Sequence, residues 1–468
     1  MNTLQLDVNL WAEQQFGQCD LGDRRRTRRA VQAAAQFAAN PDGSTPKQTE
    51  SWADCEGVYR LFHEDDVTFQ ALTMPHFLKT RDRKPGHYLL LGDTTTVDFG
   101  SHRKVEGLKP VGDGNGLGFL LHSSLMVTPE DGGIIGMAGQ LIYYRQPTPE
   151  NETPRQRLQR EDRESSIWGD VVRQVGPAAS GVRYTHVFDR GADNFEVYCR
   201  LILTPTDWVV RAAQLKRGIQ TPERKKMQLR EYLAGLPVKG TYDLEIPARR
   251  EQPARTAHVE VRSGELILPR PRECSPFVRE CGIEEIFMGV VEVREVNPPA
   301  TVEPLHWVLL TSHEVKSFEQ AWTVIGYYEK RPIIEEYHKA LKTGCRLEER
   351  QYRTNRRLEA ATGVLSILAV RLLQLRTAAR REPERPAEQV VPRRWLEMLR
   401  AVQKGRHREI ATVYEFYRAL ARLGGFLARK CDGEPGWLTL WQGFEKLHLF
   451  LRGAEAMKQK WFIRRKRT

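Results

Sequence analysis

The segment Tyr88-Leu89-Leu90-Leu91-Gly92-Asp93-Thr94-Thr95-Thr96-Val97 is an apolar, β-forming run that ends in a carboxylate and hydroxyl groups. Such a run predicts a strand that brings Asp93 to its end. Glycine-rich turns then separate two further apolar runs, Phe119 to Val127 and Ile134 to Tyr144. They predict two more strands, and the three strands together predict an antiparallel meander.

A crossover follows this meander. Arg155 to Val175 predicts a charged helix, and Val182 to Phe188 predicts another strand, which stops at Asp189. Trp208 to Arg211 predicts one more strand of the same sheet. An antiparallel meander, a crossover helix and further strands predict a mixed α/β sheet, in which neighbouring strand ends bring distant residues together.

The rest of the chain contains regions with different predicted secondary structure. Residues 1–80 favour helices, and Asp23 predicts a cap for a helix that begins at Arg24. Residues from about 235 to 305 are β-rich and punctuated by Gly and Pro, which predicts an inserted β subdomain with separate strands at His258 to Arg262 and Leu266 to Leu268. Helix returns from Ser317 to the end of the chain. Near the end of the chain, apolar residues recur every three or four positions, which predicts a helix with one broad aromatic face. Core packing is the first explanation of this face, and a subunit interface is the second. Its residues are Trp437, Leu440, Trp441, Phe444, Leu447 and Leu451.

Composition narrows the class of protein. A chain of 468 residues with 40% hydrophobic and 28% charged residues is typical of a soluble globular protein of two to four domains. Its 72 Lys and Arg against 60 Asp and Glu give a net charge of +12, which favours a polyanionic partner. Seven scattered cysteines without a Cys-x-x-Cys pair predict reduced thiols in a cytoplasm. No apolar run approaches the ~18–20 residues of a membrane helix, so we expect no membrane association.

The segment from Tyr328 to Gly344 carries the most chemical information. On one continuous helix, Glu335 and Lys342 fall within ~20° of each other, and Lys339 lies one turn from Glu335. One helix face therefore presents a carboxylate among cations. A surface helix with salt bridges between successive turns is the usual explanation of such a face.

The spacing Tyr328-x2-Arg331-x3-Glu335-x6-Lys342 resembles the Tyr-Arg-Glu-Lys signature of a large bacterial insertion-sequence class of DDE transposases. Asp93-Thr94-Thr95 and Asp189-Arg190-x-Ala192-Asp193 precede it in the expected order. The resemblance runs almost end to end and is closest to the cut-and-paste transposase of a composite kanamycin-resistance transposon. It implies a helical DNA-end-binding domain at 1–80, a ribonuclease-H-like catalytic domain at 81–375 with a β-rich insertion at about 235–305, and a helical C-terminal domain for dimerisation at 376–468.

The same resemblance implies that Asp93, Asp189 and Glu335 are catalytic and bind metal. In-line attack on a phosphodiester builds negative charge on the entering and leaving oxygens, and two divalent ions ~3.5–4 Å apart can stabilise both. Carboxylates suit Mg²⁺ or Mn²⁺, so we expect two ions in each active site. By resemblance, Asp93 bridges the ions while the other two acids bind one each. Taken alone, each strand-end aspartate is an ordinary turn or cap residue.

The resemblance further implies a set of DNA contacts. Expected near the scissile phosphate are Arg211, Tyr328, Arg331 and Lys342, with Lys339 as a further contact. Trp307 stands where the family has an aromatic residue that stacks on an unpaired base, and a core position is the alternative explanation. Expected to contact the terminal inverted repeat are Arg25, Arg26, Arg29 and Arg60. A solvated helix face is an equal alternative for this N-terminal arginine cluster.

The predicted function is cut-and-paste transposition. Water would nick the transposon end, the freed 3′-hydroxyl would form a hairpin on the opposite strand, and the resolved end would join target DNA. The expected partners are double-stranded DNA, at transposon ends and target, and a second copy of the chain in a synaptic homodimer. The expected place is the bacterial cytoplasm, with nucleoid association when DNA is bound. A stand-alone metal-dependent nuclease and a DNA-binding protein without catalysis are the alternatives.

Overall fold

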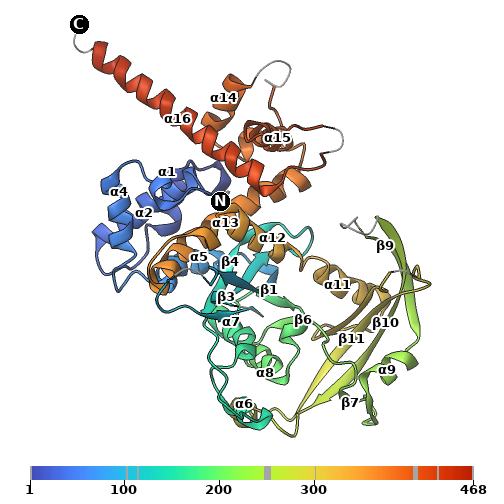
Figure 1. Cartoon of the computed structure of the whole chain (residues 1–468). Helices are drawn as coiled ribbons and strands as arrows, with labels where there is room; N and C mark the ends of the chain where they lie inside the picture. The colour runs from blue at the N-terminus through green and yellow to red at the C-terminus, as the bar shows by residue number, and fades with distance from the viewer. Residues whose placement is uncertain are drawn as a thin grey trace.

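A computed structural model describes residues 3–101, 104–112, 115–246, 254–300, 302–403, 409–429 and 432–465. A central sheet runs through the molecule, and the helices of the two chain ends lie together at one end of it (Figure 1). The N-terminal helices are α1 (Val8–Phe16), α2 (Arg24–Ala39), α3 (Thr45–Gln48), α4 (Trp52–Leu61) and α5 (Phe69–Arg81). Asp23 caps α2 by accepting a hydrogen bond from the Arg25 amide, as its sequence predicts.

One 12-stranded sheet has the order β2-β3-β1-β5-β6-β12-β11-β10-β7-β8, with β4 paired to β3 and β9 paired to β10. The strands of its first half are β1 (Gly86–Asp98), β2 (Lys109–Val111), β3 (Gly116–Val127), β4 (Ile134–Tyr143), β5 (Val182–Phe188) and β6 (Asp207–Arg211). Strands β4, β3 and β1 are antiparallel neighbours, whereas β1, β5 and β6 run parallel. The predicted mixed sheet is therefore confirmed.

The register of β1 and β5 explains how Asp93 and Asp189 come together. The predicted strand end at Asp93 is wrong, because β1 continues to Asp98 and Asp93 pairs with Ser123 of β3. Leu91 pairs with Val187 in the parallel ladder, and each aspartate lies two residues beyond that pair. Gly92 allows the close approach, because a Cβ atom there would stand 2.2 Å from the Phe188 ring. The absence of a side chain at Gly92 thus lets the residue before Asp189 pack directly against the residue before Asp93.

The second half of the sheet extends the first without a break. Its strands are β7 (Gly218–Gln220), β8 (Lys226–Gln228), β9 (Val238–Ile246), β10 (Arg255–Pro269), β11 (Glu285–Glu295) and β12 (His306–Thr311). Strand β12 pairs with β6, so the long antiparallel strands of the predicted insertion continue the central sheet. The helices beside them are α8 (Phe195–Leu203), α9 (Leu229–Gly235) and α10 (Pro276–Glu280).

Two local predictions are wrong. The crossover is not one helix, because α6 (Pro154–Gln159) ends at Arg160, whose extended backbone and ion pair with Asp162 interrupt it before α7 (Ile167–Val175). The separate strands expected around His258 and Leu266 are one continuous strand, β10, whose whole length pairs with its neighbours β9 and β11. Tertiary pairing overrides the local pattern in the second case.

The remaining helices are α11 (Phe318–Tyr328), α12 (Ile333–Lys339), α13 (Asn355–Arg381), α14 (Arg393–Val402), α15 (Val413–Leu423) and α16 (Trp437–Arg465). Among the described residues, α13 is the single helix long and apolar enough to cross a membrane by length and composition. However, 89% of its most apolar window is buried inside the protein, as in a core helix. Helix α13 is also continuous across position 376, where the sequence predicts a domain boundary.

Buried arginines join the N-terminal helices to the rest of the chain. Arg350, which is 3% exposed, donates hydrogen bonds to the Pro41 carbonyl (2.9 Å), the Gln48 side chain (2.7 Å) and the Cys345 carbonyl (2.7 Å). Arg371 of α13 donates to the Leu6 carbonyl (2.6 Å). These charged donors satisfy carbonyl groups that would otherwise be buried without partners.

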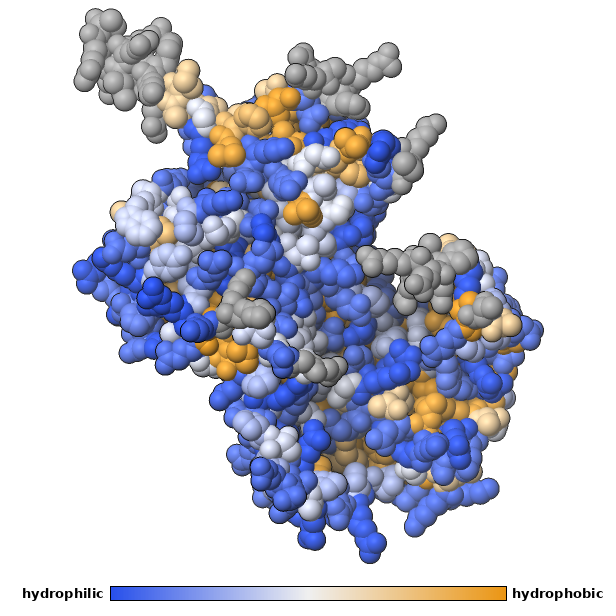
Figure 2. Space-filling model, in the orientation of Figure 1, coloured by the Kyte–Doolittle hydropathy of each residue, from blue (hydrophilic) through white to orange (hydrophobic). Residues whose placement is uncertain are grey.

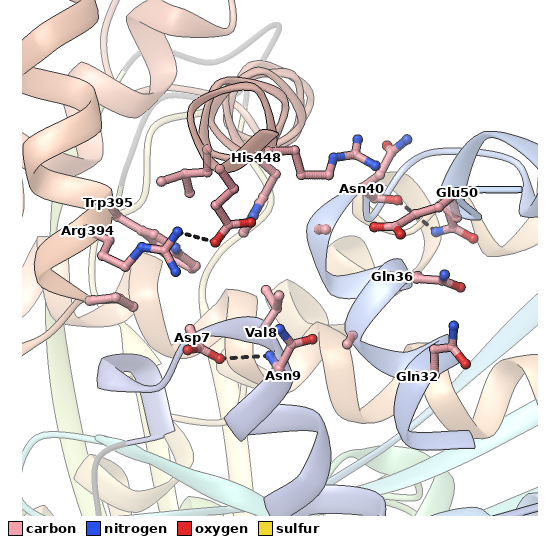
Figure 3. A pocket seen from close by; sticks show the side chains of 17 residues that line it. Asp7, Val8, Asn9, Gln32, Gln36, Asn40, Glu50, Arg394, Trp395 and His448 are labelled. Atoms are coloured by element: carbon pink, nitrogen blue, oxygen red, sulfur yellow. Dashed lines mark hydrogen bonds and ion pairs between the residues drawn. The ribbon is translucent and has the colours of Figure 1, made fainter. Parts of the chain in front are cut away.

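A cavity of about 380 Å³ lies where the N-terminal and C-terminal helices meet, between α1, α2, α14 and α16. Figure 3 shows Asp7 capping the first turn of α1 on one side, and the ion pair of Arg394 with Glu455 on the other. None of the three acids predicted to be catalytic lines this cavity. The cavity therefore lies at the contact between the two chain ends and not at the predicted catalytic site.

Replacement of Arg350 by Met tests this docking. The substitution leaves several buried acceptors without a donor, so we expect the free energy of unfolding to fall by about 2–4 kcal/mol. Arg346→Met is the matched control, because that side chain is 45% exposed and pairs only at the surface with Glu349. Its effect should stay below about 1 kcal/mol in chemical denaturation. Equal losses for the two variants would contradict the structural role of Arg350.

Candidate active site

Arg331 lies between the three carboxylates that the sequence singles out. Its Nη2 atom is 2.8 Å from Asp93 Oδ1 and 3.1 Å from Asp189 Oδ2, and its Nη1 atom is 2.7 Å from Glu335 Oε1. One guanidinium thus forms ion pairs with acids from β1, from the end of β5 and from α12. The structure brings the three predicted acids together around a single cation.

The chain around Pro332 produces this arrangement. Helix α11 ends at Tyr328, and Pro332, which has no amide donor, is the N-cap of α12. Arg331 stands in the turn between the helices, and Glu335 lies in the first turn of α12. The four-residue separation of Arg331 and Glu335 lets their side chains meet.

The predicted alignment of Glu335 with Lys342 on one helix face is wrong, because α12 ends at Lys339 and a π-helical turn follows from Ala340 to Gly344. This wider turn changes the direction of the side chains after Lys339. Lys342 instead donates to the Thr96 carbonyl of β1 (2.8 Å) and pairs with Glu348 (2.9 Å). It therefore lies beside the strand that carries Asp93.

The electrostatics single out Asp93 among the three acids. Its side chain is 13% exposed, and burial raises the pKa of Asp93 to about 6. The positive charge of Arg331 lowers this pKa, whereas the nearby carboxylates of Asp189 and Glu335 raise it. Burial outweighs the ion pair, so the ionised carboxylate is held at a free-energy cost.

A buried polar group behind Asp93 was missed by the sequence reasoning. His338 Nδ1 lies 3.7 Å from Asp93 Oδ2, and its Nε2 lies 3.3 Å from the Ser123 hydroxyl. Burial lowers the pKa of His338 to about 3, so its ring is neutral at pH 7. Its spacing of three residues from Glu335 was the available signal, because such residues share a helix face.

Aromatic and cationic residues lie close to Arg331 and Asp189. The rings of Trp307 on β12 and Tyr328 on α11 meet edge to face, with centroids 5.5 Å apart. Burial raises the pKa of Tyr328, while the neighbouring Arg211 and Arg331 lower it. Arg211 also donates to the His306 carbonyl (3.0 Å). The predicted contacts Trp307, Tyr328, Arg211 and Arg331 therefore form one cluster.

The other predicted DNA contacts lie outside this cluster. Lys339 is 58% exposed and pairs with Glu336 (2.9 Å), which also pairs with Arg376 of α13. The N-terminal arginines pair with acids of the same N-terminal region: Arg25 with Asp23, Arg26 with Glu64 and Asp66, Arg29 with Asp54, and Arg60 with Glu56.

Metal-ligand geometry is not preassembled. In the described part of the chain, no three His, Cys, Asp or Glu side chains form a group that could hold a metal ion. The guanidinium of Arg331 stands between the carboxylates instead. The donor set itself consists of carboxylate oxygens on three separate elements, which is the chemistry that Mg²⁺ and Mn²⁺ select.

Comparison with known families identifies both ends of the chain. Residues 8–67 match the family described as Transposase DNA-binding. Residues 367–460 match the family described as Transposase Tn5 dimerisation domain. Together they support a Tn5-type transposase. The transposase thus has a DNA-binding match over α1, α2, α3 and α4, a dimerisation match over most of α13 to α16, and the carboxylate cluster between them.

The dimerisation match includes an exposed apolar face. In α16, the predicted aromatic face packs inward, since Trp437, Trp441 and Phe444 are at most 7% exposed. Leu449, Phe450 and Met457 are 51%, 44% and 70% exposed. Figure 2 shows apolar side chains on the C-terminal helices, at the top of the view. Core packing is confirmed for the first face, whereas the second face is exposed in the single chain.

The raised pKa of Asp93 gives a testable pH dependence. Its folded-state value of about 6 exceeds the ordinary value of 3.8, so the folded transposase binds more protons than the unfolded chain between these pH values. The contribution of Asp93 to the free energy of unfolding therefore falls as pH rises through this window. Asp93→Asn removes that loss, which amounts to about 2–3 kcal/mol.

Thermal or chemical denaturation in chelator, from about pH 4 to pH 7.5, measures this difference. Relative to wild type, Asp93→Asn should gain stability as pH rises. Asp98→Asn, at the exposed end of the same strand, is the control and should follow the wild-type profile. Parallel wild-type and Asp93→Asn profiles would show that burial does not perturb Asp93.

Proposed function

We propose that this transposase moves DNA by a cut-and-paste reaction: it binds terminal inverted repeats, cleaves phosphodiester bonds through a hairpin, and joins the 3′ ends to target DNA. The convergence of Asp93, Asp189 and Glu335 on one guanidinium carries this proposal. Three acids from distant parts of the chain lie close together although their charges repel one another. Such a costly arrangement of like charges is typical of a functional site. A DNA-binding protein that had lost catalysis would have no need for this arrangement.

The sheet supports the same proposal. An antiparallel β4-β3-β1 meander followed by parallel β5 and β6 is the strand arrangement we propose to be ribonuclease-H-like. In this arrangement Asp93 within β1 and Asp189 just after β5 are neighbours, and α12 adds the third acid. The fold thus delivers all three carboxylates to one side of the sheet.

We propose Mg²⁺ or Mn²⁺, two ions per site, as the cofactors of this reaction. The three carboxylates would hold them, and the ions would supply charge stabilisation for the entering and leaving oxygens. The chain's own groups then position DNA. Arg211 and Arg331 provide guanidinium groups for phosphate, Lys342 adds a point charge beside β1, and Trp307 offers a ring for an unpaired base.

The remaining expected features follow from the two family matches. The dimerisation match favours a synaptic homodimer over a stand-alone nuclease, since cut-and-paste transfer needs two paired ends. A DNA-binding transposase is expected in the cytoplasm, and we propose that it associates with the nucleoid when bound to DNA. The N-terminal arginines Arg25, Arg26, Arg29 and Arg60 remain the proposed contacts to the inverted repeat.

The first test replaces each acid separately. Asp93→Asn, Asp189→Asn and Glu335→Gln should each lower cleavage of paired transposon ends by about 10³-fold or more, while end binding stays within about twofold. The DNA that flanks the reading frame supplies the end sequences, because short inverted repeats there identify the substrate. Cleavage is measured on gels in Mg²⁺ or Mn²⁺, and binding by mobility shift in chelator.

Glu336→Gln is the matched control, because Glu336 follows Glu335 but pairs with Lys339 and Arg376. It should retain cleavage. Wild-type cleavage by any of the three acid variants would refute the triad. Joined products on a target plasmid separate transposition from nuclease activity, and cleavage without joining would support the nuclease alternative.

The second test concerns the exposed face of α16. Phe450 and Met457 are seven residues apart and share a helix face. The double variant Phe450→Glu, Met457→Glu should weaken homodimer formation at least about tenfold, because it places charge in an apolar contact. Analytical sedimentation with and without end DNA measures this. Glu445→Lys, which lies ~140° around the same helix from Phe450, is the control, and equal dimerisation of the double variant and wild type would exclude this face.

A further inference from the structure

Arg331 has two incompatible sets of partners if the proposed function holds. In the DNA-free transposase, its two Nη atoms donate to Asp93, Asp189 and Glu335. Cleavage requires the same carboxylate oxygens as ligands for divalent ions. A guanidinium at 2.7–3.1 Å from those oxygens both occupies their lone pairs and repels another cation.

We propose that Arg331 is a resident cation that closes the carboxylate site of the free transposase, and that it must turn away before the three acids can hold divalent ions. This inference rests on the proposed function and adds a control step to it. The guanidinium would leave the carboxylates for a phosphate of bound DNA, which offers the same paired oxygen acceptors. DNA binding and metal binding would then favour each other through one side chain.

The surroundings of Arg331 allow such a movement. Asp189 and Glu335 are 33% and 47% exposed, so the carboxylate cluster opens toward solvent on their side. Among the described residues, the Nε atom of Arg331 is buried without a hydrogen-bond partner. The side chain is therefore held only through its two Nη atoms, and it projects from the turn between α11 and α12.

The neighbouring cationic groups do not replace Arg331 in this role. Lys342 is engaged by the Thr96 carbonyl and by Glu348. His338 is buried and neutral at pH 7, since burial lowers its pKa to about 3. Lys339 pairs with Glu336, outside the cluster. Once Arg331 turns away, the three carboxylates therefore face one another with no other charged side-chain cation in contact among the residues that the structure describes, which favours a divalent ion.

The proposal makes metal affinity depend on Arg331. If the closed arrangement is at least about ten times more populated than the open one, the apparent dissociation constant for a divalent ion rises by the same factor. Removing the guanidinium removes this competition. We therefore expect Arg331→Gln, as the full-length chain without DNA, to bind Mn²⁺ at least about tenfold more tightly than wild type.

Electron paramagnetic resonance of free Mn²⁺ measures binding without any cleavage. Lys339→Gln is the matched control, because it removes a neighbouring positive charge from α12 without touching the carboxylates; its Mn²⁺ affinity should stay within about twofold of wild type. The double variant Arg331→Gln, Glu335→Gln should lose the gain, which places the bound ion at this site. Arg331→Lys keeps the charge but not the paired donors, and should fall between wild type and Arg331→Gln.

Thermal unfolding provides a second measurement. In chelator at pH 8, Arg331→Gln should melt below wild type, because three carboxylates lose their shared cation. Mn²⁺ should raise the melting temperature of Arg331→Gln more than that of wild type. If Arg331→Gln does not fold, Arg331→Lys decides the question, and an unchanged Mn²⁺ affinity in that variant overturns the proposal.

The outcomes separate this inference from the function it rests on. Equal Mn²⁺ affinities of wild type and Arg331→Gln, or an equal gain in Lys339→Gln, overturn the inference while leaving the acid triad intact. Wild-type cleavage by the Asp93→Asn, Asp189→Asn or Glu335→Gln variants overturns the proposed function instead. Tight Mn²⁺ binding by Arg331→Gln alone, with loss in the double variant, supports both the site and its closure.

Discussion

Mutual repulsion among three carboxylates is the constraint around which the centre of this transposase is arranged. Asp93, Asp189 and Glu335 can share one place only if a cation separates them, and Arg331 is that cation. The parallel pairing of β1 and β5 brings the first two acids together, the first turn of α12 adds the third acid, and the turn before α12 adds the guanidinium. Burial keeps the interaction strong, because water is largely excluded from Asp93 and Arg331.

This centre is mechanically connected to the C-terminal helices. The π-helical turn after α12 ends at Gly344, where a Cβ atom would lie 2.3 Å from Trp441 Nε1 of α16. Only glycine lets the indole lie so close to the backbone there. The dimerisation match therefore contains a side chain packed against the segment that follows Glu335. Movement of α16 would act on the position of that segment through direct contact.

The sequence predicted those parts of the centre that depend on local pattern. An apolar run before Asp93 and another before Asp189 were enough to predict two strands that each carry an acid. The predicted strand end holds for Asp189 but is wrong for Asp93, because β1 continues past Asp93 to Asp98 in its pairing with β3. The π-helical turn was not predicted, and its last residue, Gly344, packs against Trp441 of a helix that is distant in the sequence, a contact that no local pattern reports. The present partners of Arg331 also escaped prediction. The Tyr-Arg-Glu-Lys signature indicates that Arg331 contacts a phosphate, whereas in the chain without DNA its guanidinium pairs with carboxylates.

Exposure distinguishes Arg331 from the predicted DNA contacts of the N-terminal helices. Arg25 and Arg60 are 87% and 74% exposed, and each pairs with a single acid. Exposed ion pairs contribute only about 0–1 kcal/mol, so a DNA phosphate can replace those acids at little cost. Arg26 is 31% exposed and also donates to the Leu21 carbonyl, so its release costs more. Arg331 is 13% exposed and pairs with three acids. In the proposed movement, a phosphate would therefore have to replace the acids as its partner, and another cation would have to replace Arg331 among the acids.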